Sequence, residues 1–177
     1  MGDSAPLAGT LVRQFDLATK LARYHIDALT TEECMWRPSA KGPHVAQSAS
    51  GAWRADWPEN EDIDIGAPSI AWLTWHLGFW LSMAIDHNFA KASLAREDVF
   101  WPGDAASTRV WLLELCAQWR THIEGLSDLA LCSSQRTHWP YRDRPFADLV
   151  AWANIELAKN ASEIGYARLL YASRSNA

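Results

Sequence analysis

Apolar side chains recur at three- and four-residue spacing along four long segments of this chain, which is the pattern of amphipathic α-helices. The first segment covers residues 7–29, the second 68–90, the third 104–125 and the last 145–173. No stretch alternates in the way that a large sheet requires, so we predict an all-α four-helix bundle. The pattern contains no repeat and no internal boundary, which predicts a single domain over residues 1–177.

Two long polar connections separate the predicted helices. Residues 38–68 are rich in proline and glycine, and within them residues 44–47 and 52–57 flank the turn-like stretch 48–51. That arrangement predicts a small β-hairpin between the first two helices. A connection this long in a compact domain is usually functional or packs over one end of the fold. Because the other long connection follows the third helix, we expect these two to allow a departure from simple up-and-down order.

Composition and charge narrow the classes of partner. Apolar residues make up 49% of the chain and charged residues 21%, as in ordinary globular proteins. The net charge of −5 and the lack of a Lys/Arg run argue against nucleic acid, because phosphate binding needs a concentrated basic face. The longest apolar stretch, residues 70–85, is too short to span a bilayer comfortably, and the N-terminus lacks a signal-peptide pattern. We therefore expect a cytoplasmic protein with no membrane partner.

The cysteines and tryptophans add two expectations. Cys34, Cys116 and Cys132 are odd in number and form no CxxC pair, so the sequence predicts neither a disulfide framework nor a cysteine zinc site. The chain also contains 11 tryptophans, which is unusually many for 177 residues. Each brings a large apolar ring and an N–H that needs a partner when buried. We expect most of them to fill the core, and some to line a pocket.

One polar side chain lies in the middle of the apolar second helix. His76 has apolar neighbours in Trp75-His76-Leu77-Gly78, so we expect its imidazole to be shielded from water. On the last helix, Glu156, Asn160 and Glu163 share one face at positions i, i+4 and i+7. Because buried polar groups need partners, we predict a polar site between these two helices, centred on His76.

Three interpretations of this polar site remain open. His76 could bind a divalent metal together with Glu156, Asn160 or Glu163, since imidazole, carboxylate and amide oxygen all ligate nickel, zinc or manganese. Alternatively, Glu156 or Glu163 could hydrogen-bond one ring nitrogen and leave the other as a general base, which makes His76 and Glu156 candidate catalytic residues. In the third interpretation, the same groups satisfy one another as a buried network that fixes the register of the bundle.

Three motifs resemble the DinB-like superfamily of four-helix proteins. The segment Ser-Ile-Ala-Trp-Leu-Thr-Trp-His-Leu at 69–77 is similar to the second-helix motif of that family, and Trp-Arg-Pro at 36–38 is similar to the sequence after its first helix. The last helix resembles the family from Trp152 through the stretch at 160–165. The resemblance extends over roughly residues 7–174. It implies an up-down-down-up bundle that is frequently a homodimer.

The resemblance also implies a metal site that this chain only partly matches. Members hold a divalent metal, often nickel or zinc, with one histidine on the second helix and two on the last, spaced i and i+4. His76 matches the first, but the last helix contains no histidine. If Gly165 marks the family's glycine after the final histidine, Lys159 and Glu163 stand at the other two positions. A register one turn earlier places Glu156 and Asn160 there.

These observations support two hypotheses of function. In the first, the chain is a small-molecule enzyme of the DinB-like type. Some relatives use a low-molecular-weight thiol, mycothiol or bacillithiol, as transferases or isomerases. Trp72, Trp80 and Trp152 would then form the apolar walls of a substrate pocket between the second and last helices. In the second, the loss of two histidines leaves a non-catalytic protein that binds a ligand or serves as a dimer scaffold.

Overall fold

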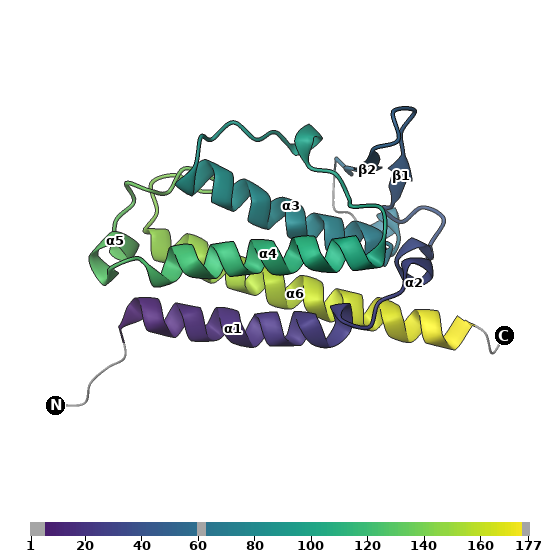
Figure 1. Cartoon of the computed structure of the whole chain (residues 1–177), viewed down its shortest axis with the longest axis horizontal. Helices are drawn as coiled ribbons and strands as arrows, with labels where there is room; N and C mark the ends of the chain where they lie inside the picture. The colour runs from purple at the N-terminus through teal and green to yellow at the C-terminus, as the bar shows by residue number, and fades with distance from the viewer. Residues whose placement is uncertain (1–5, 60–62, 175–177) are drawn as a thin grey trace.

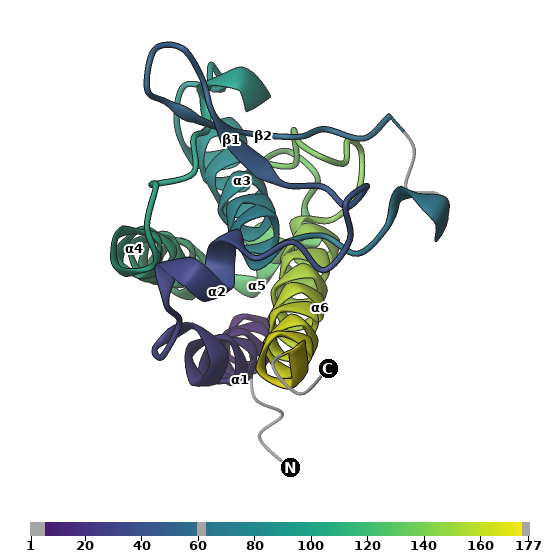
Figure 2. The same ribbon diagram turned by 90° about the vertical axis from the view of Figure 1, so that its right-hand side faces the viewer.

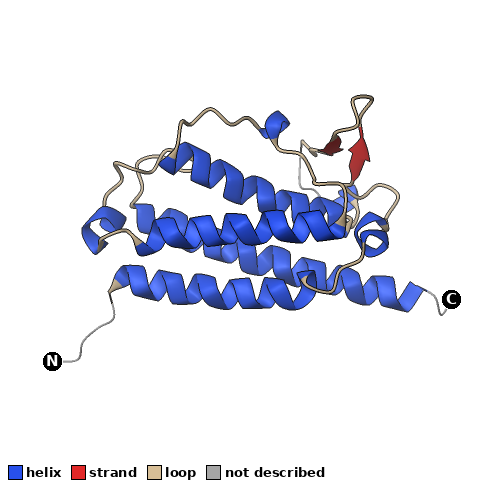
Figure 3. Ribbon diagram, in the orientation of Figure 1, coloured by secondary structure: helices blue, strands red, loops and turns tan. Residues whose placement is uncertain are grey.

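The predicted four long helices are present in the computed structural model, which describes residues 6–59 and 63–174. They are α1 (Leu7–Ile26), α3 (Ile70–Phe89), α4 (Ala105–Glu124) and α6 (Phe146–Ser173). Two helices of five residues each, α2 (Thr31–Met35) and α5 (Asp128–Cys132), lie in the connections, together with two 3-10 turns, η1 (Ile63–Ile65) and η2 (Arg96–Asp98). The predicted all-α class is therefore confirmed (Figure 3).

The four long helices form a ring in the order α1, α4, α3, α6, seen end-on in Figure 2. In Figure 1, α1 and α6 run in one direction and α3 and α4 in the other, which is the up-down-down-up arrangement. Two parallel neighbours must be joined by a chain that returns along the whole bundle. That return is made by residues 90–104, between α3 and α4. The expected departure from simple up-and-down order is present, but the return segment 90–104 makes it. The connection from α1 to α3 joins these helices at one end of the bundle, and the connection from α4 to α6 joins those helices at the other end.

Side-chain caps place the starts of the central helices. The Ser69 hydroxyl accepts a hydrogen bond from Trp72 N and begins α3, and the Asp104 carboxylate accepts one from Ser107 N at the start of α4. Both residue types are preferred at helix N-caps, since their oxygens satisfy N–H groups that have no intrahelical partner. Ser69 is buried, and its hydroxyl lies 2.8 Å from His44 Nδ1, so the start of α3 is also tied to the long connection.

The long connection folds over one end of the bundle. It contains the predicted hairpin, with shorter strands than the sequence indicated: β1 (Val45–Gln47) pairs antiparallel with β2 (Trp53–Ala55). The hairpin lies beside the start of α3 in Figure 1. The indole N–H of Trp72 donates to the Asp56 carbonyl just after β2, at 2.8 Å. This connection therefore packs against the helix that carries His76.

The core is filled by large aromatic side chains, as the composition predicted. Trp75, Trp101 and Trp119 are almost fully buried, and two of their N–H groups have partners. Trp75 donates to the Val99 carbonyl and Trp101 to the Thr74 hydroxyl, so the return segment 90–104 is attached to α3 by indole hydrogen bonds. No helix of the described residues is long and apolar enough to cross a membrane.

Candidate functional site

His76 lies inside the bundle, on the side of α3 that faces α6. Its side chain is only 4% exposed. The Trp72 ring, one turn earlier on α3, stacks on the imidazole with a centroid distance of 4.7 Å and an interplanar angle of 15°. Because Trp72 is itself held by its bond to Asp56, the face of the imidazole is fixed by the long connection as well as by α3.

Both ring nitrogens of His76 have hydrogen-bond partners. The Trp80 indole N–H donates to Nε2 at 2.7 Å, and Nδ1 lies 3.1 Å from Asn160 Oδ1 on α6. An indole nitrogen can only donate, so Nε2 carries the lone pair and Nδ1 carries the hydrogen that it donates to Asn160. This geometry describes a neutral imidazole in one defined tautomer.

Asn160 connects this imidazole to the last helix. It is completely buried, and its Nδ2 donates to the Glu156 carbonyl at 2.8 Å and lies 3.4 Å from Glu156 Oε2. Since Nδ2 faces a carbonyl, the amide oxygen must face His76, in agreement with the tautomer above. Asn160 therefore takes the place beside Nδ1 that one of the three interpretations gave to a carboxylate, and Glu156 is linked to the imidazole through Asn160.

A cavity of about 220 Å³ opens beside this network, between α3, α6 and the long connection. Its polar lining consists of His76, Lys159 and Glu163. Lys159 Nζ lies 3.8 Å from Glu156 Oε2 and 3.9 Å from Glu163 Oε1, so the ammonium group sits between two carboxylates. The apolar lining comes mostly from the long connection and the start of α3, namely Pro43, Pro58, Ile65, Pro68, Trp72 and Leu73.

The structure separates the three tryptophans that were expected to line one pocket. Trp72 lines the cavity. Trp80 and Trp152 lie instead in an aromatic cluster with Trp139 and Tyr141, where the rings of Trp80 and Trp152 meet edge to face at 4.9 Å. Trp80 and Trp152 are not among the residues that line the His76 cavity, so their role in binding a substrate stays a prediction. Trp80 contributes through its N–H, because that group covers Nε2 of His76.

These donors do not fit a transition-metal site in the arrangement observed. The lone pair of Nε2 accepts the Trp80 N–H, and the only other ring nitrogen carries the hydrogen bonded to Asn160. A protonated Lys159 is not a ligand, and the buried Asn160 side chain is not among the residues that line the cavity. Across residues 6–59 and 63–174, no group of three or more His, Cys, Asp or Glu side chains is close enough to hold a metal ion.

The comparison with protein families identifies the fold. The family model of the DinB superfamily matches residues 14–164, which is most of the chain. This chain belongs to the DinB superfamily. No curated protein matches it.

Membership in the DinB superfamily gives the cavity geometry a further meaning. The register defined by Gly165 places Lys159 and Glu163 at the positions of the two last-helix histidines, and these residues line the same cavity as His76. The alternative register would use Glu156 and Asn160, but Asn160 is buried in the network behind the imidazole. Of the two registers, the first is the one whose two residues both line the cavity. In it, this DinB protein carries an ammonium group and a carboxylate where the family resemblance implies two imidazoles.

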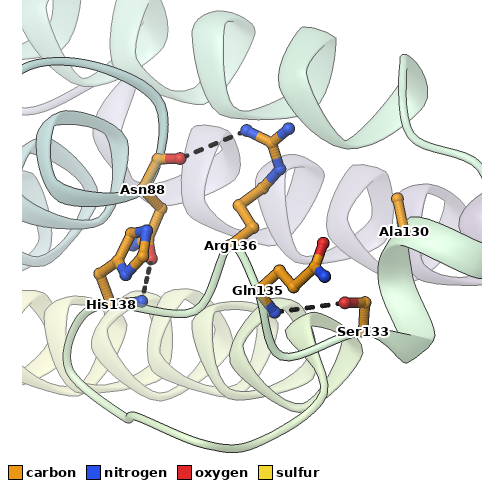
Figure 4. A pocket seen from close by; sticks show the side chains of 6 residues that line it. All are labelled: Asn88, Ala130, Ser133, Gln135, Arg136 and His138. Atoms are coloured by element: carbon orange, nitrogen blue, oxygen red, sulfur yellow. Dashed lines mark hydrogen bonds between the residues drawn. The ribbon is translucent and has the colours of Figure 1, made fainter.

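A second cavity lies at the other end of α3 and has a different character. Its volume is about 360 Å³, and its lining includes Gln135, Arg136 and His138 from the connection before α6 (Figure 4). The buried Asn88 side chain accepts from His138 N and donates to the Trp139 carbonyl, while Arg136 donates to the Asn88 carbonyl at 3.4 Å. Arg136 also lies over the Phe89 ring. These contacts close the C-terminal end of α3. His138 binds Asn88, which follows His76 on α3 by 12 residues, or roughly 18 Å along the helix axis.

The chain's own thiols are poorly suited to nucleophilic chemistry in the bundle. Burial raises the pKa of Cys34 and of Cys116 to about 12 in both cases. Only the thiolate is nucleophilic, so these two groups are unreactive near neutral pH. Cys132, at the end of α5, is exposed.

We expect a thiol-specific chromogenic reagent at pH 8 to titrate one cysteine quickly in the native protein and three after unfolding. Cys132→Ser should remove the rapid phase and leave the slow ones, because Cys34 and Cys116 become accessible only when the bundle opens. Any rapid equivalent in native Cys132→Ser protein would contradict the burial of Cys34 and Cys116.

Several cavity residues were not found from the sequence. Pro43, Pro58 and Ile65 come from the long connection, and only their proline and glycine-rich surroundings indicated that this segment packs over one end of the fold. The indole N–H of Trp80 was overlooked as a partner for His76, although the spacing of four residues places both on one helix face. That spacing was the available signal.

Proposed function

We propose that this DinB protein is a small-molecule enzyme whose reaction takes place in the cavity lined by His76, Lys159 and Glu163. The observation that carries the proposal is that His76, Lys159 and Glu163 line one cavity. In the register set by Gly165, these three residues stand where the family resemblance implies three histidines. A cavity that joins apolar walls to a few convergent polar groups is the usual form of a small-molecule site. Nickel, zinc or manganese is not required in this proposal.

The reaction class we propose is thiol-dependent group transfer, with a low-molecular-weight thiol as cosubstrate. The Lys159 ammonium would supply the positive charge that stabilises the thiolate, and the Glu163 carboxylate is placed to accept the thiol proton. His76 would position the wall of the site through Trp72 and Asn160 rather than react itself, because both its nitrogens are hydrogen-bonded. Glu156 would hold Lys159 and Asn160 in place.

We expect Lys159→Met to slow thioether formation at least tenfold in a reaction where a small thiol loses its proton and displaces chloride from an activated aryl chloride. The loss of the ammonium removes the charge that stabilises the thiolate, while the half-exposed position of Lys159 leaves folding unaffected. Lys20→Met, at an exposed position on α1, is the matched control and should keep full activity. Elemental analysis of untagged protein accompanies the assay, and stoichiometric metal would contradict the metal-free form of the proposal.

A non-catalytic ligand-binding protein is the second candidate, and the two hydrogen bonds of His76 favour it. A histidine whose nitrogens both pair within the bundle is what a structural network requires. If the wild-type protein shows no thioether formation above the uncatalysed rate but still binds ligands in the cavity, this candidate holds.

We also propose that the partner of this chain is a second copy of itself. The outer faces of α1 and α6 expose large apolar side chains, which supports a helix-to-helix contact between protomers. These exposed residues are Leu17, Leu21, Tyr24, Ile155, Tyr166 and Leu169.

A further inference from the structure

An apolar groove continues directly from the His76 cavity along α6. Its volume is about 350 Å³, and it shares Pro68, Leu73 and Glu163 with the lining of the cavity. Beyond these shared residues the groove is bounded mainly by Pro38, Ala67, Ala167 and Leu170. The two hollows are therefore adjacent parts of one elongated site, with its polar groups at one end.

The chemistry of the groove wall differs from that of the cavity. Glu163, at the junction, is the one charged residue among its described lining residues. The Ser162 hydroxyl donates to the Ala158 carbonyl of its own helix at 2.9 Å, which leaves Tyr166 as the other polar side chain. A surface of this kind gains free energy mainly by covering apolar area, so it suits an alkyl or similarly apolar group.

The charges around the cavity indicate which polar group belongs at the other end. The charges of the Lys159 ammonium and the Glu163 carboxylate offset each other, and Glu156 adds a second carboxylate 3.8 Å from Lys159. An anionic head group that enters from solvent would therefore also face two like charges, whereas a thiol that gives its proton to Glu163 adds no net charge to the site. A neutral group that both donates and accepts hydrogen bonds can pair with Lys159 and Glu163 together.

We propose that the substrate of this site is an amphiphile, with a neutral hydrogen-bonding head in the His76 cavity and an alkyl chain in the groove along α6. This inference rests on the proposed function, since it names the substrate class of the same cavity. The occupant follows from the continuity of the two hollows: a molecule whose head reaches Lys159 has its apolar end at Leu73 and Leu170.

The test uses the whole protein and a series of primary alkanamides from butanamide to octanamide, with binding measured by calorimetry and ligand-observed NMR. Each added methylene should tighten binding about threefold to fourfold until the groove is filled, as expected for burial of one methylene. Alkanoates of the same chain length should bind at least tenfold more weakly at pH 7.

A variant that blocks the groove tests whether the alkyl chain of the ligand lies there. Ser162 is exposed and lines the groove, so Ser162→Trp should fill the groove and abolish the gain with chain length while butanamide binding is unchanged. Thr121→Trp, at an exposed position on α4 whose hydroxyl likewise donates to the carbonyl four residues earlier, is the matched control and should keep the wild-type series. The wild-type series stands by itself if Ser162→Trp does not fold.

The outcomes separate this inference from the proposed function. Three outcomes would each overturn the proposal of a neutral-headed amphiphilic substrate. They are amide binding that does not tighten with chain length, alkanoates that bind more tightly than amides, and no amide binding at all. None of these results affects the thioether assay, which judges the proposed enzyme through Lys159. If the wild-type protein forms no thioether above the uncatalysed rate but shows the expected chain-length series, the proposed enzymatic function is overturned and the amphiphile-binding site stands.

Discussion

Arg168→Ala is expected to lower the free energy of unfolding by about 3 kcal/mol, the cost of leaving a buried carboxylate without its cation. Arg168 Nε donates to Glu33 Oε1 at 3.0 Å, and Nη1 donates to the His25 carbonyl at 2.9 Å. The Glu33 side chain is 11% exposed and that of Arg168 is 25% exposed, so solvent screens the pair weakly. The arginine on α6 thus holds both the end of α1 and the capping box of α2, in which Glu33 accepts from Thr30 N.

Thermal unfolding measures this loss, and we expect the melting temperature to fall by about 6–12 °C for a chain of this size. Arg174→Ala is the matched control. Its ion pair with Glu32 lies at the surface, where Glu32 is 79% exposed, so less than about 1 kcal/mol should be lost. The pKa of His25 is lowered mainly by burial and to a smaller extent by the positive charge of Arg168. Because Arg168→Ala removes that charge, the pKa of His25 should rise in the variant. Equal losses in the two variants would show that Glu33 does not depend on Arg168.

Asn160→Leu is expected to lower the free energy of unfolding by about 2 kcal/mol, because the change leaves the Nδ1–H of His76 without its acceptor inside the bundle. Leucine is close to asparagine in size, so the loss reports the polar network more than a cavity. Chemical denaturation measures it, with an unchanged m-value expected. Gln118→Leu makes the same exchange of amide for alkyl at an exposed position of α4 and should change stability by less than about 0.5 kcal/mol.

The double variant His76→Leu/Asn160→Leu extends this measurement. If the two side chains satisfy each other, the double variant loses less than the sum of the single variants, with a coupling of about 1 kcal/mol or more. Additive losses would mean that His76 and Asn160 do not form the hydrogen bond described above. The result also bears on the proposed function, because a strong coupling assigns His76 to positioning rather than to proton transfer.

The helices could be predicted because their information is local. The three- and four-residue spacing of Leu11, Phe15 and Ala18 on α1 depends only on the period of the helix, and the buried residues of α1 include all three. The Thr30 capping box has an equally local cause, since its two hydrogen bonds join residues three apart. The small hairpin followed from turn residues between two short apolar runs, although its strands are only three residues long.

The composition of the site could not be predicted in the same way, because its contacts join distant parts of the chain. Pro43 and Pro58 reach the cavity only because the long connection folds back over the start of α3. Trp152 has the spacing of a core residue and the chemistry of a pocket wall, and only packing against Trp80 separates the two roles. The choice between Glu156 and Asn160 as the partner of His76 depends on a shift of α6 along its axis by about one turn relative to α3.

The sequence by itself determined the class of fold, the family to which the chain belongs, and the position of His76 inside the bundle, because periodicity and motif spacing are carried by neighbouring residues. Only the tertiary structure decided that Trp80 covers Nε2, that Asn160 takes Nδ1, and that Lys159 and Glu163 face the same cavity. These facts depend on how α3 and α6 are rotated against each other. That rotation is set by the packing of the whole core, which no single segment of the chain encodes.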